Sequence, residues 1–389
     1  MTAGDAGPAR AWVRLREPTA AAAVPVETPS ASYQVLVGRG LTGRLDELLP
    51  PLPGAGVAAL VRPAPLASVA ERAARALERL GLTVHQLDLP DGEAAKRLAV
   101  IESLYQRLAA IPTRRADPVV AVGGGATTDA AGFAAATWLR GVPLVSLPTT
   151  LLAMVDAAIG GKTGVDLEAG KNLVGAFHQP AAVVADLDTL ATLPAAELRA
   201  GMAEVIKAGL IADPALAAAC LERAPAAVAG DLDALAPLVE RAIAIKAEVV
   251  GGDEREAGRR AILNYGHTLG HALERLAGYQ GLRHGEAVAL GMVFAARVAE
   301  AAGLAPAGLA DGHVELLRAA GLPVGGVALD PDAVLAAMGT DKKRGAGGLR
   351  LVLLRAPGQP ELVPAPERGL LVEAIRSLAA EPAAGRGCR

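Results

Sequence analysis

The sequence is poor in several features that mark particular protein classes. Aromatic residues make up only 2% of its 389 residues, which argues against a surface for stacking bases or sugars. Its two cysteines, Cys220 and Cys388, lie far apart, so a disulfide framework is excluded and a reducing cytoplasm is expected. The net charge of −3 gives no positive excess for binding nucleic acid or an anionic membrane. No apolar run approaches the roughly 18 residues that a membrane span needs.

The remaining composition is that of a folded, globular protein. Hydrophobic residues make up 52% of the chain and charged residues 20%, which leaves ample apolar surface for a core. At roughly 100–200 residues per domain, the length predicts two domains. The first 28 residues combine alanine, proline and charge without any period. We therefore expect a disordered leader over residues 1–28.

From residue 29 the pattern alternates between strands and helices. Short apolar runs predict strands over 33–37, 57–61, 83–87, 118–122, 144–147 and 182–185. Helical periodicity separates several of these runs, over 66–80, 94–109 and 128–139. This alternation predicts a parallel sheet covered on both faces, and thus an α/β, Rossmann-like nucleotide-binding domain over residues 29–195.

The alternation stops after Leu193-Pro194, and mostly helical patterns follow. We predict helices over 196–211, 214–223, 234–250, 258–276, 285–302, 309–319 and 369–379, and one short strand over 349–354. The second domain, residues 196–389, is therefore expected to be mainly α-helical. A cleft between two such domains is the usual place for a small-molecule site.

Two glycine-containing turns in the first domain are suited to a dinucleotide. Gly123-Gly124-Gly125 follows a predicted strand and precedes a helix, so backbone N–H groups there can approach a pyrophosphate. Because the spacing is not Gly-x-Gly-x-x-Gly, a plain strand–helix turn is the alternative. Asp91-Gly92-Glu93 offers carboxylates for ribose hydroxyls, and a solvated turn is the alternative there.

A third stretch, residues 148–172, is rich in glycine, lysine and threonine and contains Lys162 and Lys171. We expect an irregular loop, because glycine weakens both helices and strands. Such a loop suits phosphate binding through lysine and backbone N–H groups. The spacing is not that of a Walker A motif, and an ordinary surface loop is the alternative.

Three of the six histidines lie close together in the helical half, at His267, His271 and His284. His267 and His271 are four residues apart on a predicted helix and so share a face. Glu204 lies in an apolar helical stretch, where a carboxylate needs a partner. Two histidines with one carboxylate leave open positions for substrate oxygens, as catalytic zinc sites do. The other three histidines, His85, His178 and His313, have no such neighbouring ligand residues in the sequence, so we predict structural roles for them.

A polar stripe is predicted along the helix 258–276, because Arg260, Asn264, His267 and His271 recur at intervals of three and four residues. A solvated helix face is the usual reading of such a stripe. This one contains a candidate metal ligand, so we expect it to face the cleft. Further charges in this half are Lys246, Glu256, Lys342 and Lys343. Together these features suggest oxidation or elimination chemistry on a phosphorylated, carboxylated polyol.

The motifs occur in an order that is similar to one known family. The matching stretches are 91–96, 123–129, 131–133, 140–141, 148–156, 160–164, 170–173, 177–180, 203–207, 246–250, 253–256, 264–271, 284–288 and 341–343. They include Gly170-Lys171-Asn172 and Asn264-Tyr265-Gly266-His267-Thr268-Leu269-Gly270-His271. Over residues 28–365 the chain thereby resembles the 3-dehydroquinate synthase family of the sugar phosphate cyclases.

The resemblance implies a dehydroquinate synthase-like fold and an NAD- and metal-dependent cyclase. The family converts 3-deoxy-D-arabino-heptulosonate 7-phosphate into 3-dehydroquinate and phosphate, with NAD and a divalent metal, zinc or cobalt. The implied metal ligands are Glu204, His267 and His284. The implied NAD site comprises Asp91, Gly92, Glu93, Lys96, Gly123, Gly124, Gly125, Ala126, Thr127, Thr128, Asp129, Thr149, Thr150, Lys162, Lys171, Thr189, Leu190, Ala191 and Thr192.

The same resemblance implies a set of substrate and catalytic residues. They are Asp156, Lys162, Asn172, Lys207, Lys246, Glu256, Arg260, Asn264, His271, Lys342 and Lys343. Arg140 is expected to reach the substrate phosphate, from the partner subunit of a homodimer. No nucleic acid or membrane partner is expected.

Three other functions remain open at this stage. An aminodehydroquinate synthase would take an amino analogue of the same substrate in a nearly identical site. A metal-dependent polyol or glycerol dehydrogenase shares the two-domain plan, but the lysines favour a phosphate- and carboxylate-bearing substrate. A non-catalytic binding protein would have lost a metal ligand or the cofactor turn, and neither is lost. Valiolone-type relatives usually lose the second histidine of the Gly-His-x-x-Gly-His pattern, whereas His271 is kept here.

Overall fold

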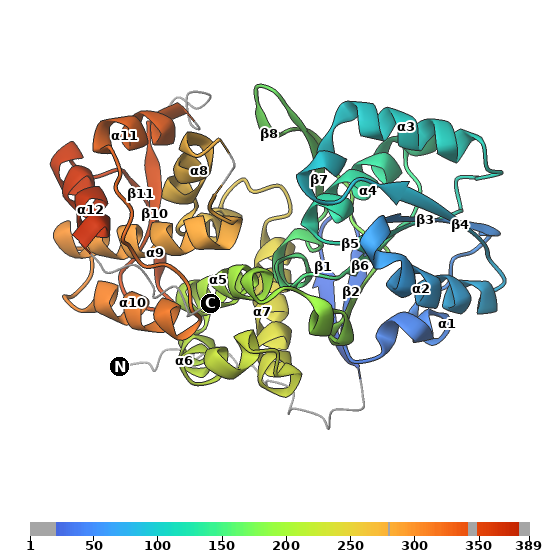
Figure 1. Ribbon diagram of the computed structural model, residues 1–389, viewed down its shortest axis with the longest axis horizontal. Coiled ribbons are helices and arrows are strands. Elements are labelled where there is room, and N and C mark those ends of the chain that lie inside the picture. The colour runs from blue at the N-terminus through green and yellow to red at the C-terminus, as the bar shows by residue number, and fades with distance from the viewer. Residues whose placement is uncertain (1–20, 279–280, 341–347, 381–389) are drawn as a thin grey trace, which may run out of the picture.

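The computed structural model describes residues 21–278, 281–340 and 348–380, and Figure 1 shows two halves side by side. One half is built on a sheet and the other is mainly helical. The predicted sites Lys342 and Lys343, residue Cys388 and residues 1–20 of the expected leader lie outside the described residues. None of the described helices is both long and apolar enough to cross a membrane.

Within the described residues, seven strands form the main sheet. They are β1 (Ala22–Glu27), β2 (Ser32–Gly38), β3 (Val57–Pro63), β4 (Thr83–Leu89), β5 (Val119–Gly123), β6 (Leu144–Pro148) and β9 (Ala182–Asp186). Their spatial order is β1-β2-β9-β6-β5-β3-β4, and every neighbouring pair is parallel except β1 and β2. The predicted parallel α/β sheet is therefore confirmed.

Helices cover both faces of this sheet, as its fully buried central strands β5, β6 and β9 require. On one face α1 (Leu45–Leu48) and α2 (Ala67–Arg79) pack on residues such as Val120 and Val122 of β5. On the other face α3 (Leu98–Ala109) and α4 (Gly125–Thr137) pack on Val119 and Ala121 of the same strand. Alternate residues of one strand thus serve two cores.

The second half consists of eight α-helices and a hairpin among the described residues. The helices are α5 (Ala195–Ala212), α6 (Pro214–Val228), α7 (Leu232–Gly252), α8 (His267–Leu276), α9 (His284–Ala301), α10 (Leu309–Ala319), α11 (Pro331–Thr340) and α12 (Arg368–Ala380). The hairpin pairs β10 (Arg350–Leu354) with β11 (Pro360–Pro364). Its main core also includes Val35 of β2 and Val183 of β9, so one apolar cluster joins the two halves.

The disordered leader predicted for residues 1–28 is wrong over residues 22–27, which form the edge strand β1. The side chains of β1 alternate in burial, and Val26 is fully buried where α7 packs against the strand. Pro25 is compatible with this position, because an edge strand leaves one side of its backbone unpaired. The alternation spans too few residues to stand out in an alanine- and proline-rich sequence.

The stretch 148–172 is more regular than its glycines predicted. A π-helix, Ala153–Ala157, is followed by strands β7 (Lys162–Leu167) and β8 (Gly170–Phe177), which form an antiparallel hairpin beside the gap between the halves (Figure 1). A Cβ atom on Gly175 would lie 2.2 Å from the Thr163 carbonyl oxygen. Glycine therefore allows the two strands to approach closely instead of breaking them.

A buried polar pair, Tyr265 and His313, lies in the helical core. The Tyr265 hydroxyl is 2.8 Å from Nε2 of His313, and Nδ1 of His313 is 2.7 Å from the Leu309 carbonyl oxygen. Because a carbonyl can only accept, Nδ1 carries the proton and Nε2 accepts from the tyrosine. Burial lowers the pKa of His313 to about 4, so the ring is neutral at neutral pH.

We expect His313→Gln to flatten the pH dependence of stability between about pH 4 and 6.5. In the wild type the unfolded chain binds a proton at His313 in this range, at its ordinary pKa of about 6.5, and the folded chain does not. Folding stability therefore rises with pH across the window. The slope should fall by up to about 1.4 kcal/mol per pH unit in the variant. Urea unfolding at several pH values measures it, and equal slopes would contradict the prediction.

Candidate metal and nucleotide site between the two halves

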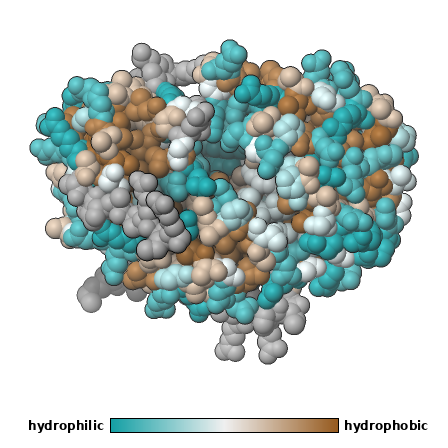
Figure 2. All heavy atoms as spheres, viewed as in Figure 1, coloured by the Kyte–Doolittle hydropathy of each residue, from teal (hydrophilic) through white to brown (hydrophobic). Residues whose placement is uncertain are grey.

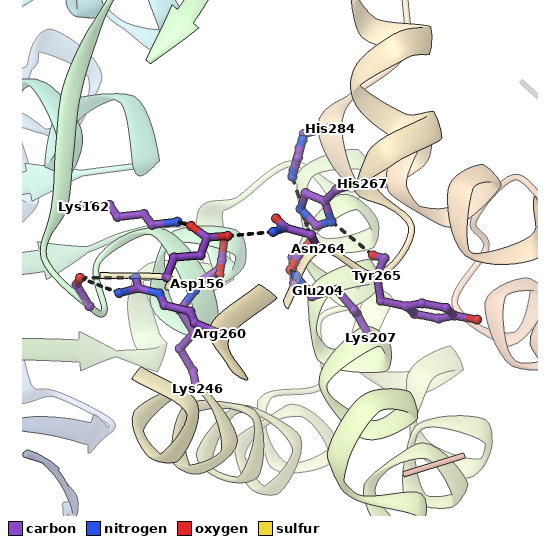
Figure 3. A network of polar contacts seen from close by, with 12 residues as sticks. Asp156, Lys162, Glu204, Lys207, Lys246, Arg260, Asn264, Tyr265, His267 and His284 are labelled. Carbon is purple, nitrogen blue, oxygen red and sulfur yellow. Dashed lines mark hydrogen bonds and ion pairs between the residues drawn. The ribbon is translucent and has the colours of Figure 1, made fainter. Parts of the chain in front are cut away.

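Three side chains from three helices converge on one another (Figure 3). Glu204 lies on α5, while His267 and His284 are the first residues of α8 and α9. Oε1 of Glu204 is 3.7 Å from Nε2 of His267 and 3.8 Å from Nε2 of His284. This oxygen is buried and has no hydrogen-bond donor among the described residues. A buried carboxylate oxygen facing two imidazole nitrogens is the donor set of a divalent zinc-type ion.

Hydrogen bonds at the opposite edge of each ring orient the two imidazoles. Nδ1 of His267 is 3.1 Å from the Tyr265 carbonyl oxygen, and Nδ1 of His284 is 3.4 Å from Oε1 of Glu274. An acceptor at Nδ1 places the proton there and leaves the Nε2 lone pair for a metal. Burial and the nearby Lys207 hold the pKa of His267 well below its usual range. The pKa of His284 is raised, because Glu274 and Glu204 outweigh the effect of its burial.

Glu274 is a functional candidate that the sequence analysis missed. It lies three residues after His271 on α8, is buried, and belongs with His271 and His284 to a second close group that shares one histidine. Its pKa is lowered, because hydrogen bonding and charge from His284 outweigh its burial. The available signal was a carboxylate on the apolar face of an amphipathic helix, which requires a partner.

We call Glu204, His267 and His284 the metal group. A cavity of about 930 Å³ runs from His284 of this group along the carboxyl ends of the strands. Its wall is formed by the turn after β4, the N-terminus of α4, the end of β6 and the start of β8. Of the predicted cofactor residues it includes Asp91, Gly92, Glu93, Lys96, Gly124, Gly125, Ala126, Thr127, Asp129, Thr149, Thr150 and Lys171. The first backbone N–H groups of α4, a helix of thirteen residues, face this cavity and suit a pyrophosphate.

Several predicted cofactor residues do not line this cavity. Gly123 ends the buried strand β5, and the Thr128 hydroxyl donates to the Gly125 carbonyl oxygen within its own helix. The segment Thr189, Leu190, Ala191 and Thr192 belongs to a 3-10 helix, and the residues after it, Leu193 and Pro194, line the wall instead. Lys162 faces the neighbouring cavity. Thr128 and Thr189–Thr192 were implied by the resemblance alone, whereas Gly123 and Lys162 were singled out because they lie in glycine-rich segments suited to phosphate.

A second cavity of about 530 Å³ adjoins the first and shares Asp129, Asp156 and Asn172 with it. Figure 2 shows the molecule hollowed between its halves, with hydrophilic residues gathered there. Of the other predicted substrate residues, Lys162, Lys246 and Arg260 line this second cavity. The two cavities form one cleft from the metal group to the hairpin.

The cations of the cleft are paired with carboxylates. Ion pairs join Lys162 to Glu256, Lys246 to Asp156 and Lys207 to Glu204. Asn264 donates to Oε1 of Glu256 at 2.6 Å, so Glu256 contacts both the cavity-lining Lys162 and an amide. Burial alone would raise the pKa of Glu256, but Lys162 outweighs it and lowers that pKa. An anion that enters the cleft therefore meets several cations, each of which is already paired with a carboxylate side chain.

The predicted continuous stripe along a helix 258–276 is wrong, because the helix breaks at Tyr265-Gly266. Residues Arg259–Asn264 form a 3-10 helix, and α8 starts only at His267. Gly266 has φ 79°, and a Cβ atom there would lie 2.7 Å from the Val288 carbonyl oxygen. Arg260 is consequently buried and donates to the carbonyl oxygens of Gly160 and Glu254, while Nε has no partner among the described residues.

His271 and Arg140 take different places relative to the cleft. His271 lines the larger cavity, and its ring centroid is 5.3 Å from that of His267. Arg140 has φ 67° at the end of a short helical turn and lines a separate hollow of about 440 Å³. It reaches neither cavity of its own chain. The structure thus brings His271 to the metal group and leaves Arg140 outside it.

The fold and the site together define a class: a two-domain α/β and α-helical protein with a dinucleotide-type cavity beside a two-histidine, one-carboxylate group. Comparison with known proteins makes the assignment specific. Sequence models of the 3-dehydroquinate synthase N-terminal and C-terminal regions match residues 86–200 and 201–344. The chain belongs to the 3-dehydroquinate synthase family.

Individual relatives agree over nearly the whole chain. A 3-dehydroquinate synthase of Rhodococcus opacus (strain B4) is 47% identical over 359 residues, covering 91% of this chain and 95% of the relative. The crystal structure of 2-deoxy-scyllo-inosose synthase with carbaglucose-6-phosphate, NAD+ and Co2+ is 30% identical, with a TM-score of 0.82 over 92% of this chain and 100% of the other. The 2-epi-5-epi-valiolone synthase of Streptomyces hygroscopicus subsp. jinggangensis 5008, with NAD+ and Zn2+, is 29% identical, with a TM-score of 0.81 over 90% and 97%.

Proposed function

We propose that the chain is a 3-dehydroquinate synthase, a carbon–oxygen lyase of aromatic amino acid biosynthesis. It would convert 3-deoxy-D-arabino-heptulosonate 7-phosphate into 3-dehydroquinate and phosphate. The observation that carries the proposal is Oε1 of Glu204, a buried carboxylate oxygen without a donor among the described residues that faces two imidazole Nε2 atoms. Family membership supplies the substrate. The low cysteine content supports a cytoplasmic location.

The residues present fit the two groups that this chemistry needs. NAD would supply a reversible hydride acceptor, and a divalent zinc or cobalt ion would supply a Lewis acid. Glu204, His267 and His284 would hold the ion. The turn after β4 and the N-terminus of α4 would hold the dinucleotide, with Asp91 and Glu93 suited to ribose hydroxyls. Related cyclases solved with NAD+ and with Co2+ or Zn2+ support this assignment.

The chain's own residues bind and orient the substrate. Lys162, Lys246 and Arg260 line the second cavity and would hold the substrate carboxylate and phosphate. His271 lines the larger cavity, with its ring centroid 5.3 Å from that of His267, where it can hydrogen-bond the leaving phosphate. Binding between the two halves would hold the ring-closing carbon atoms near each other.

We place Arg140 in the partner subunit's site. It lines neither cavity of its own chain, and its left-handed backbone presents it at a separate hollow. A homodimer in which this arginine crosses the interface would bring it to the substrate phosphate. An Arg140→Ala chain mixed with an inactive chain that keeps Arg140 tests this, because recovered turnover requires exchange across the interface.

Phosphate release is the experiment that tests the function. We expect phosphate from 3-deoxy-D-arabino-heptulosonate 7-phosphate with NAD and zinc or cobalt, no lasting nicotinamide absorbance at 340 nm as expected for reversible hydride transfer, and loss of turnover with a chelator. Steady NADH from a plain polyol would instead indicate a dehydrogenase. Turnover of the amino analogue alone would indicate an aminodehydroquinate synthase.

A further inference from the structure

The backbone behind His267 is held by side chains that do not face the cleft. In Figure 3 the Tyr265 ring points away from the metal group, while its carbonyl oxygen accepts from Nδ1 of His267 at 3.1 Å. The ring itself is fully buried, and its hydroxyl donates to His313 on α10 at 2.8 Å. One residue therefore connects a candidate metal ligand to a buried histidine two helices away.

The direction of this carbonyl depends on a tight turn. Tyr265 has φ −57° and ψ 126°, and Gly266 has φ 79° and ψ −21°. These are the central angles of a type II turn, about −60°, +120° and +80°, 0°. A type I turn differs by a flip of the peptide between the two residues, which would swing the Tyr265 carbonyl away from His267.

Both sides of that peptide are anchored. On the glycine side, Gly266 lies so close to α9 that a Cβ atom on Gly291 would be 1.8 Å from the Gly266 carbonyl oxygen. On the tyrosine side, the hydroxyl bond to His313 at 2.8 Å, with a longer contact of 3.4 Å to the Met292 carbonyl oxygen, fixes the ring within the core. Glycine by itself adopts many backbone conformations, so the two anchors together select the observed one.

We propose that Tyr265 and His313 are positioning residues, which hold the Tyr265 carbonyl on Nδ1 of His267 and thereby raise the metal affinity of the Glu204–His267–His284 group. The proposal rests on the metal site of the proposed function. It assigns a role to His313, for which the sequence predicted only a structural one. The neutral state of His313 supports it, because a protonated ring would donate from both nitrogens and could not accept from the tyrosine.

Cobalt binding tests the pair without relying on turnover. We expect Tyr265→Phe to weaken Co2+ affinity about threefold to tenfold, less than the roughly 10–100-fold typical of losing a direct partner of a ligand, because the carbonyl itself remains. Chelator competition measures the affinity, and the visible absorption of bound Co2+ should shift because the ring orientation changes. His313→Leu breaks the same bond from the other side and should act alike. The double variant should be no worse than either single one.

Two comparisons separate positioning from a general packing role. His313→Gln keeps an acceptor for the hydroxyl and should recover part of the affinity. Leu317→Ala, also on α10 and fully buried, should lower stability without changing Co2+ affinity or absorption. Wild-type affinity and absorption in both Tyr265→Phe and His313→Leu would overturn the proposal. Failure of the wild type to bind Co2+, measured first, would instead overturn the metal site and this proposal with it.

Discussion

Replacing Glu204 with glutamine is expected to abolish turnover, by at least about a thousandfold. The variant keeps the size of the side chain but removes the only carboxylate of the three proposed metal ligands. Its amide cannot supply an anionic ligand, and an N–H group aimed at the two imidazole Nε2 atoms would consume their lone pairs. A Lewis acid is worth several kcal/mol of barrier, and about 4 kcal/mol corresponds to about a thousandfold in rate.

The control for this variant is Glu222→Gln, an equal change of charge at an exposed position of α6. It should leave turnover and metal content unchanged. Phosphate release and metal analysis of the purified protein are the measurements. Since Lys207 loses its carboxylate partner in Glu204→Gln, the midpoint of urea unfolding must be recorded too. Full turnover in a folded Glu204→Gln protein would remove the proposed metal site.

Most strands of the sheet-bearing half could be predicted from the sequence, because they coincide with short apolar runs. Strand β5, with five buried residues, was located to within one residue at each end. Strand β1 was not predicted, because only Val24 and Val26 mark it and its burial comes from α7, more than 200 residues later. The β7–β8 hairpin was missed because glycine is ambiguous: Gly175 serves a close approach of two strands that a one-dimensional pattern cannot show.

Neighbouring site residues could be predicted from the sequence where they share one helix. Contacts between residues of different helices were harder to predict. Spacing grouped His267 and His271 with His284 and suggested Glu204 as their carboxylate, but the family resemblance was needed to choose Glu204, His267 and His284 as the ligands. Glu274 and the Tyr265 carbonyl were missed, because an acceptor for an imidazole Nδ1 is defined by how helices pack and a turn bends. The resemblance also implied Thr189–Thr192 as cofactor residues, whereas the cavity is lined by the next two residues, Leu193 and Pro194.

The ion pair between Asp156 and Lys246 supports a second large prediction, in which activity and stability respond differently. Lys246 is buried, and the Asp156 side chain is 26% exposed to the cleft. Burial alone would raise the pKa of Asp156, but Lys246 and Lys207 outweigh it and hold that pKa far below its usual range. The carboxylate is therefore ionised throughout the range in which an enzyme works, and each partner neutralises the other.

We expect Lys246→Met to lower kcat/KM about 100- to 1000-fold, the usual cost of one preorganised charge-stabilising group. It leaves Asp156 as an unpaired anion that repels an anionic substrate. Asp156→Asn should also lower turnover, because it releases Lys246 from its position. Each single change should cost stability, though less than the roughly 3–5 kcal/mol of a fully buried pair, because the cleft admits water.

The double variant Asp156→Asn/Lys246→Met should regain stability but not activity. With both charges gone, neither position 156 nor position 246 holds an unpaired ion. An uncharged pair is often no less stable than the ion pair it replaces. The substrate would still lack its cation. As a control, removing the exposed Arg355–Glu361 pair should cost less than about 1 kcal/mol and leave turnover unchanged. Urea unfolding and phosphate release on the same samples measure stability and activity. Recovered activity in the double variant would contradict the prediction and show that the pair has only a structural role.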